Sequence, residues 1–207
     1  MKNQPANRTA MLFLAAGASR RMGRSKALLP WNGTTVIGYH FEVLNSIHNI
    51  DPWVVTQEAD EPLFSELDAI GWPTAQRVVN PLAPDCDMLE SIRCGTRGIL
   101  TSDRPYQTIG IALIDQVLTK PSTFKKLEAL GVQVEKQILQ PEFRHRRGHP
   151  VLFSRSMAST LQGYTGRSLK HFLEEQETNR LTVVVSDEGV VKDMDTPEHY
   201  REQLLTT

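Results

Sequence analysis

The sequence predicts a single α/β domain in three layers, with a mostly parallel sheet and helices on both of its faces. Strand-length apolar runs alternate with segments of helical spacing through the first half of the chain. The run over residues 11–16 is continuously apolar, which is typical of a central strand buried on both faces. The chain has 207 residues, enough for one sizeable core without disulfides. We expect residues 10–207 to form the domain and the polar residues 1–9 a flexible tail.

Strands are expected, in order, at residues 11–16, 53–56, 77–79, 108–114, 132–139, 150–153 and 181–185. Helices are expected at residues 35–47, 61–70, 88–100, 122–130, 157–161, 168–175 and 197–205. Thr34 or Thr35 is the expected N-cap of the first helix, and Ser122 that of the fourth. Gly131 ends that fourth helix, and Pro197 occupies the first turn of the last one. Residues 132–139 alternate apolar with polar, as in a strand with one face in water.

Composition and charge exclude several classes of protein. Lys and Arg number 23 against 24 Asp and Glu, whereas a nucleic-acid binder usually shows a basic excess. No apolar run approaches the roughly 18 residues that cross a bilayer, and the N-terminus lacks an apolar signal region. Two cysteines cannot form a disulfide framework. The sequence therefore favours a cytoplasmic enzyme with neither a nucleic-acid nor a membrane partner.

A loop at residues 17–26 follows the first predicted strand and is typical of phosphate binding. It places four positive side chains within seven positions, at Arg20, Arg21, Arg24 and Lys26. Its glycines, Gly17 and Gly23, allow backbone N–H groups to approach an anion, and guanidinium groups grip phosphate oxygens. The spacing matches neither the Walker A loop nor the dinucleotide fingerprint.

The stretch LAAGASRRMGRSKALLP, residues 14–30, resembles the loop of the molybdenum-cofactor type of nucleotidyltransferases, above all the cytidylyltransferases among them. The resemblance implies a Rossmann-like nucleotidyltransferase fold in which this loop wraps the triphosphate of the incoming nucleotide. The nucleotide-binding positions that it implies are Leu14, Ala15, Ala16, Gly17, Arg21, Gly23 and Lys26. Guanylyl-transferring relatives usually carry Gly-Gly where this chain has Ala16-Gly17, so the implied nucleotide is CTP.

Three aspartates are candidate metal ligands. Asp115 follows the strand expected at residues 108–114, and a carboxylate at the carboxyl end of such a strand faces the ligand crevice. Mg²⁺ takes one or two carboxylates together with phosphate oxygens. By resemblance Asp115 holds Mg²⁺, although Val117 stands where the family has proline. Asp193 or Asp195, in a family-like Asp-x-Asp-Thr-Pro stretch, is the expected second ligand, unless Asp195 or Thr196 merely caps the last helix.

Two further segments match the family. The stretch Arg147, Gly148, His149 and Pro150 resembles its Gly-His-Pro segment, which by resemblance lines the acceptor side. Residues 80–95 resemble the segment that contributes the nucleotide-binding Ser91 and Arg93. Asp87 and Glu90 depart from that pattern, and acids beside a polyphosphate are unfavourable unless they face away or hold a metal.

The resemblance implies a magnesium-dependent transfer of a cytidylyl group from CTP to the phosphate of molybdenum cofactor, with release of pyrophosphate. Arg21, Lys26 and Asp115 are the expected catalytic residues. The transfer would serve maturation of a molybdenum hydroxylase, whose apoenzyme would then be a partner. Two alternatives stay open: transfer to another phosphorylated acceptor, and a non-catalytic carrier of molybdenum cofactor, which the departures at Asp87, Glu90 and Val117 would suit.

Overall fold

The computed structural model describes residues 8–17, 22–132 and 136–205. Its main strands are β1 (Thr9–Leu14), β4 (Ile50–Gln57), β5 (Arg77–Asn80), β6 (Thr108–Leu113), β7 (Ile138–Phe143), β8 (Arg146–Arg147), β9 (Val151–Ser154) and β10 (Arg180–Val184). A small hairpin joins β2 (Pro30–Trp31) to β3 (Thr34–Thr35). The helices are α1 (Val36–Asn45), α2 (Glu61–Ala69), α3 (Met88–Leu100), α4 (Pro121–Leu130), α5 (Arg155–Gln162), α6 (Leu169–Glu175) and α7 (Pro197–Leu204). Short 3-10 turns are η2 (Lys26–Leu28), η3 (Thr74–Gln76), η4 (Glu177–Asn179) and η5 (Glu188–Val191).

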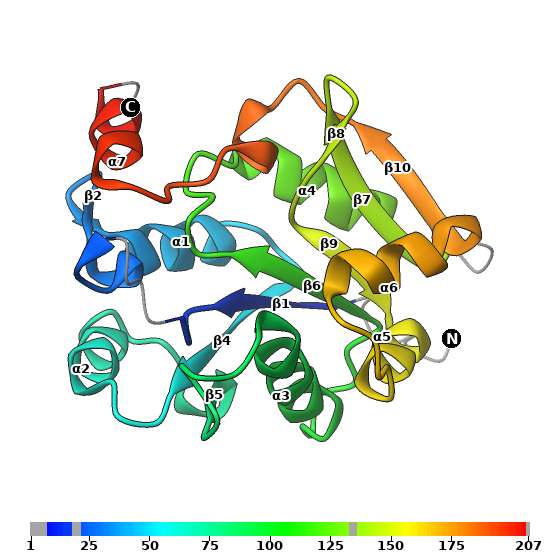
Figure 1. The fold of residues 1–207 in the computed structure, drawn as a ribbon, viewed down its shortest axis with the longest axis horizontal. Helices are drawn as coiled ribbons and strands as arrows, with labels where there is room; N and C mark the ends of the chain where they lie inside the picture. The colour runs from blue at the N-terminus through cyan, green and yellow to red at the C-terminus, as the bar shows by residue number, and fades with distance from the viewer. Residues whose placement is uncertain (1–7, 18–21, 133–135, 206–207) are drawn as a thin grey trace.

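The main sheet has the strand order β10-β7-β9-β6-β1-β4-β5, with β8 paired to β7 (Figure 1). β1 pairs in parallel with both β4 and β6, and β5 and β10 also join their neighbours in parallel. β9 runs antiparallel to β6 and β7. The mostly parallel sheet that the sequence predicts is confirmed, with β9 as the reversed strand among the longer ones.

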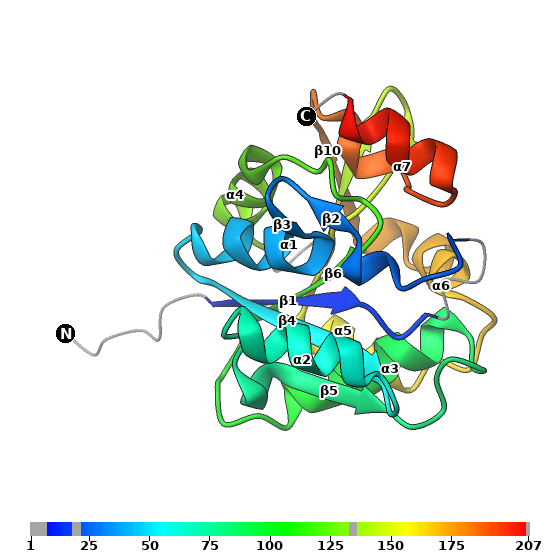
Figure 2. The ribbon, with the colours of Figure 1, turned by 90° about the vertical axis from the view of Figure 1, so that its left-hand side faces the viewer.

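The three layers follow from the alternation of side chains along β1. Met11 and Phe13 join the apolar cluster that contains the buried faces of α1 and α4. Ala10 and Leu12 point the other way, into the cluster of α3, α5 and α6. Figure 2 shows α1 and α4 on one side of β1 and α3 and α5 on the other. A continuously apolar strand is therefore required, because both of its faces are buried.

The start of α4 differs from the prediction. The helix begins at Pro121, so Ser122 is not its N-cap, and Lys120 at the cap position offers no side-chain acceptor. Asp187, far along the chain, holds this helix start instead: it accepts hydrogen bonds from the Lys120 backbone N–H, at 2.8 Å, and the Thr123 hydroxyl, at 2.5 Å. A contact from 64 residues away leaves no local signal. Thr35 is confirmed as the cap of α1.

Strand boundaries also differ, by one to three residues in all predicted strands except β7, which is displaced further. β7 covers Ile138–Phe143 rather than residues 132–139, because its pairing with β9 begins where Ile138 meets Phe153. β1 begins at Thr9, one residue before the expected domain boundary, and Arg8 pairs with the buried Asp51. Residues 1–7 lie outside the described chain. None of the described helices is both long and apolar enough to cross a membrane.

The register of the sheet positions the candidate site. β1 and β6 lie side by side with Leu14 opposite Leu113, so both strands end at the same edge. The loop that starts at Gly17 and the carboxylate of Asp115 therefore emerge next to each other, although nearly half of the chain separates them.

Candidate functional site

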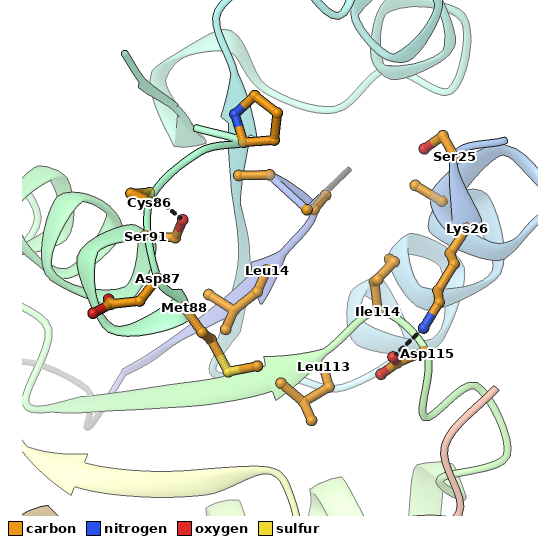
Figure 3. Close-up of a pocket in the computed structure, with 15 residues that line it drawn as sticks. Leu14, Ser25, Lys26, Cys86, Asp87, Met88, Ser91, Leu113, Ile114 and Asp115 are labelled. Carbon is orange, nitrogen blue, oxygen red and sulfur yellow. Dashed lines mark hydrogen bonds and ion pairs between the residues drawn. The ribbon is translucent and has the colours of Figure 1, made fainter. Parts of the chain in front are cut away.

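A cavity of about 310 Å³ lies at the carboxyl ends of β1 and β6. Figure 3 shows the start of α3 on one side of it, Lys26 on the other, and Leu113 to Asp115 below. The predicted residues that line it are Leu14, Ala15, Ala16, Gly17, Lys26, Ser91 and Asp115. Its other lining residues are Ser25, Ala27, Pro84, Cys86, Asp87, Met88, Leu113 and Ile114. Three separate segments thus converge here, as expected for the ligand crevice of such a sheet.

Lys26 links two of the three predicted metal ligands. Its Nζ lies 2.7 Å from Asp115 Oδ2 and 2.7 Å from Asp195 Oδ1. The lysine side chain is only 11% exposed. Burial by itself lowers the pKa of Lys26, but the carboxylates of Asp115 and Asp195 outweigh it and raise the pKa above its ordinary value. The amine is therefore a cation held between two anions.

The third aspartate, Asp193, is bound to the residue that follows Asp115. Asp193 accepts a hydrogen bond of 2.8 Å from Gln116 Nε2, and the Met194 N–H donates to the Asp115 carbonyl at 2.9 Å. Burial raises the pKa of Asp115, and the negative charges of Asp193 and Asp195 add to this, against the effect of Lys26. The site thus has two carboxylates on the buried amine and the third, Asp193, near enough to act on Asp115.

The cap of α7 settles the alternative reading of Asp195. Thr196 is the N-cap, and its hydroxyl accepts the His199 N–H at 3.3 Å. The side chain of Asp195 is directed to Lys26 instead. The cap is therefore Thr196, and Asp195 does not cap the helix.

His40 positions the backbone that carries Asp115. Its Nε2 lies 3.1 Å from the carbonyl oxygen of Ile114, and its ring packs on Phe13 at 4.4 Å between centroids. Burial lowers the pKa of His40 to about 4, so the ring is neutral near pH 7. A neutral imidazole can donate the Nε2 proton to this carbonyl. The sequence offered no signal for this contact, because 74 residues separate its partners.

The acids that depart from the family pattern have structural partners. Asp87 is the N-cap of α3 and accepts the Glu90 N–H at 2.9 Å. Glu90 forms an ion pair with Arg93 at 3.2 Å. Arg93 and Glu90 do not line the cavity, whereas Ser91 does, held by the buried Asn80 through a hydrogen bond of 3.0 Å. Asp87 is thus the acid of this pair that faces the cavity.

The predicted nucleotide-binding loop also includes Gly23 and Arg21. Gly23 lies outside the cavity lining, and its φ of +68° is a conformation that glycine adopts without strain. Arg21, like its neighbour Arg20, lies outside the described residues.

A second cavity, of about 640 Å³, adjoins the first and shares Asp87, Met88 and Leu113 with it. Its remaining lining residues are Leu89, Gln140, Arg147, His149, Arg167, Ser168, Leu169, Lys170, Leu173, Glu174 and Arg180. Of the predicted acceptor residues, Arg147 and His149 line it, but Gly148 and Pro150 do not. Arg167, Lys170 and Arg180 were not predicted, because strand pairing and the fold of α6 bring them here from elsewhere in the chain.

Gly148 has a packing role. A Cβ at this position would lie 1.9 Å from the Val190 carbonyl oxygen, which only glycine tolerates. The Gly148 carbonyl accepts a hydrogen bond of 3.2 Å from Gln140, a cavity residue. Burial lowers the pKa of the adjacent His149 to about 4, and its Nε2 has no hydrogen-bond partner among the described residues. The segment therefore presents a neutral imidazole and Arg147 to the second cavity.

Comparison with known proteins agrees with this architecture. The family model of the MobA-like NTP transferase domain matches residues 11–181. The Rv0371c protein of Mycobacterium tuberculosis H37Rv has a similar structure, with a TM-score of 0.76, 24% identity, and coverage of 97% of this chain and 99% of that one. It has also been solved in complex with manganese.

Two more distant structures share the fold. A nucleotidyl transferase of Methanothermobacter, Mth528, has a TM-score of 0.73 at 18% identity and covers 97% of this chain and 99% of its own. A CMP:2-keto-3-deoxy-manno-octonic acid synthetase complexed with CTP has a TM-score of 0.75 at 12% identity, with 96% and 98% coverage. No curated protein sequence matches the chain.

The fold of this chain, which carries the loop, the carboxylates and the two cavities, is thus shared with these transferases. The family match spans most of the chain. The chain belongs to the family with the MobA-like NTP transferase domain and is a nucleotidyltransferase of that family.

Proposed function

We propose that this protein transfers a cytidylyl group from CTP to the phosphate of molybdenum cofactor and releases pyrophosphate. The observation that carries the proposal is the contact between the two cavities at Asp87, Met88 and Leu113, directly beside the carboxylates that Lys26 joins. A transferase needs two substrates to meet at one phosphorus atom with the acceptor oxygen in line. Two adjoining cavities with a charged centre beside their shared wall suit that requirement.

The first cavity suits the nucleotide. The backbone of Leu14 to Gly17 forms one wall, and the side chains of Ser91 and Cys86 face it from the α3 side. Ala16 stands where guanylyl-transferring relatives usually have glycine, so the family resemblance favours cytosine over guanine as the base. Lys26 is placed to neutralise phosphate charge once an incoming polyphosphate competes with the aspartates for its amine.

The carboxylates suit a divalent metal ion. Asp115 and Asp195 already hold one positive group between them, the amine of Lys26. No three His, Cys, Asp or Glu side chains converge into a complete metal site in the described parts of the chain, so a bound Mg²⁺ would take its other ligands from phosphate and water. Such an ion would neutralise charge at the reacting phosphate. The residues proposed to hold it are Asp115 and Asp195, with Asp193 oriented by Gln116 beside them.

The second cavity suits the acceptor. Leucines provide an apolar surface for a flat ring system, and Gln140, Arg147 and His149 provide polar groups along one side. The neutral His149 can accept or donate a hydrogen bond without adding charge. A pterin combines an aromatic face with several hydrogen-bonding edges, which such a lining recognises.

The departures from the family pattern do not require a non-catalytic carrier. Asp87 caps a helix, Glu90 is paired with Arg93, and Val117 is buried in the apolar core. Each has a structural role, so we favour the enzyme over the carrier.

Calorimetric titration with CTP, GTP, ATP and UTP, with and without Mg²⁺, tests whether the protein binds CTP as its nucleotide. We expect binding of CTP that depends on Mg²⁺ and is lost in Asp115→Asn. Pyrophosphate release on addition of CTP and molybdenum cofactor tests the transfer, with sugar phosphates as competing acceptors. If the protein binds both CTP and molybdenum cofactor but releases no pyrophosphate and leaves the cofactor unchanged, it is a carrier and not a transferase.

A further inference from the structure

Two arginines at the far end of the second cavity share one carboxylate. Arg147 contacts Glu177 through both terminal nitrogens, at 2.7 and 3.1 Å. Arg180 Nη2 contacts the same carboxylate, and Arg180 Nη1 donates to Gln140 Oε1 at 3.0 Å. Both guanidinium groups line the cavity, but Glu177 does not. Arg147 and Arg180 together carry two positive charges, and the single carboxylate of Glu177 balances only one of them.

Burial of the charged Arg180 side chain carries a desolvation penalty that its present contacts only partly offset. Its side chain is 3% exposed, and its Nε has no hydrogen-bond partner among the described residues. Burial, and after it the nearby positive charge of Arg147, lowers the pKa of Arg180, against the opposing effect of the Glu174 carboxylate. Buried charges are normally paired and fully hydrogen-bonded, because desolvation is otherwise uncompensated. An additional anion in the cavity would balance the positive charge that Glu177 leaves over.

This cluster is remote from the reacting centre. Arg180 begins β10, and the strand order places β10 three strands away from β6, which leads into Asp115. At a strand spacing of about 4.8 Å the two strands lie roughly 14 Å apart. The register also places Arg180 level with Ile109 of β6, six residues before Asp115, so a phosphate that reacts beside Asp115 lies too far away to contact Arg180 as well.

We infer that the acceptor carries a second anionic group, separate from the phosphate that receives the nucleotide, and that Arg147 and Arg180 bind it in competition with Glu177. The inference rests on the proposed function, since it names a property of the acceptor. Between its two charged ends the acceptor lies along apolar side chains, among them Leu89, Leu169 and Leu173. Arg167 and Lys170 line this cavity as well. With Arg147 and Arg180 they make four cationic side chains, against Glu174 and Glu177 as the acids beside them, so positive charge remains in surplus here.

The test uses inorganic phosphate as the probe, titrated calorimetrically into full-length protein saturated with Mg²⁺ and a non-hydrolysable CTP analogue. Arg147→Gln should weaken phosphate binding about tenfold, because it removes a charge-assisted pair. Glu177→Gln should strengthen it, by roughly threefold or more, because it removes the competing carboxylate. A residue with a purely structural role would not produce this gain. Arg201→Gln is the matched control, since Arg201 pairs with Glu198 three positions earlier but lines neither cavity.

The second anion site is supported if phosphate affinity falls in Arg147→Gln, rises in Glu177→Gln and stays unchanged in Arg201→Gln. Equal phosphate affinities in the unmodified protein and all three variants would overturn it. A loss in Arg201→Gln as large as in Arg147→Gln would also overturn it, because phosphate would then respond only to general surface charge. CTP binding is measured on the same samples. If CTP binding is intact while phosphate affinity ignores Arg147 and Glu177, the anion site fails and the proposed nucleotide transfer stands.

Discussion

The amine of Lys26 lies 2.7 Å from the carboxylate of Asp115, a residue 89 positions later in the chain. The same amine lies 2.7 Å from Asp195, so one buried cation occupies the space between two predicted metal ligands. Repulsion between carboxylates at short range is large in a partly buried site, and the lysine offsets it. A divalent ion and the Lys26 amine would compete for these oxygens, and binding of a polyphosphate would favour the ion by attracting the amine.

Lys26→Met should therefore strengthen metal binding and reduce turnover together. We expect the affinity for Mn²⁺ in the absence of nucleotide to rise about tenfold, because the competing charge is gone. Pyrophosphate release from CTP should fall by roughly 10²-fold or more, because phosphate charge is no longer neutralised. Electron paramagnetic resonance of Mn²⁺ measures the first quantity without any turnover.

Lys125→Met is the control for the lost lysine, since Lys125 is exposed on α4 and lines neither cavity. It should leave both Mn²⁺ affinity and turnover unchanged. The competition between amine and metal is refuted if Lys26→Met and Lys125→Met bind Mn²⁺ equally well.

Asp193 and Asp195 should differ in their effects on nucleotide binding. Asp195 shares Lys26 with Asp115, whereas Asp193 is held by Gln116 at 2.8 Å. We expect Asp195→Asn to weaken Mg²⁺-dependent CTP binding at least about tenfold and Asp193→Asn to weaken it only a few-fold. Calorimetry with and without Mg²⁺ provides the comparison. A larger loss in Asp193→Asn would reverse the assignment of the two residues.

Local sequence patterns predicted most of the fold. The continuous apolar run before Gly17, the spacing in α1 and the Asp-Thr-Pro start of α7 each depend on neighbours within a few residues. The start of α4 and the boundary of β7 depend instead on Asp187 and on pairing with β9. Contacts over such distances have no signature in one sequence.

The candidate site divides in the same way. Gly17, Lys26 and Asp115 lie in segments whose composition and position after a strand indicate a site, and all three line the first cavity. Arg180 and His40 could not be found in this manner, because each acts through a partner 40 or 74 residues away. The family resemblance pointed to Gly148 as an acceptor residue, but it could not separate a packing requirement from contact with a ligand.

Gly148→Ala should destabilise the protein. The added Cβ would lie 1.9 Å from the Val190 carbonyl oxygen, and backbone cannot yield as a flexible side chain does. We expect a loss of about 1–3 kcal/mol in the free energy of unfolding. Gly163→Ala is a matched control, since its nearest neighbour would be Thr160 O at 3.8 Å. Urea denaturation compares the two variants, and equal midpoints would show that η5 can move away from residue 148.

The stability of the protein should fall as the pH drops below neutrality, in part through His40. Its pKa is about 4 in the folded state against an ordinary value of 6.5. Between these values the unfolded chain binds a proton that the folded chain does not, so acid favours unfolding, while above pH 6.5 the group contributes no slope.

His40→Gln should remove this contribution and keep an amide that can donate to the Ile114 carbonyl. We expect the variant to lose about 2 kcal/mol less stability than the unmodified protein between pH 7 and pH 5. Urea denaturation at each pH measures the difference, with His48→Gln as the exposed-histidine control. Parallel stability curves for His40→Gln and the unmodified protein would mean that His40 does not hold a depressed pKa. The ring would then take up its proton as readily in the folded chain as in the unfolded one, and burial would not be what keeps it neutral in front of Asp115.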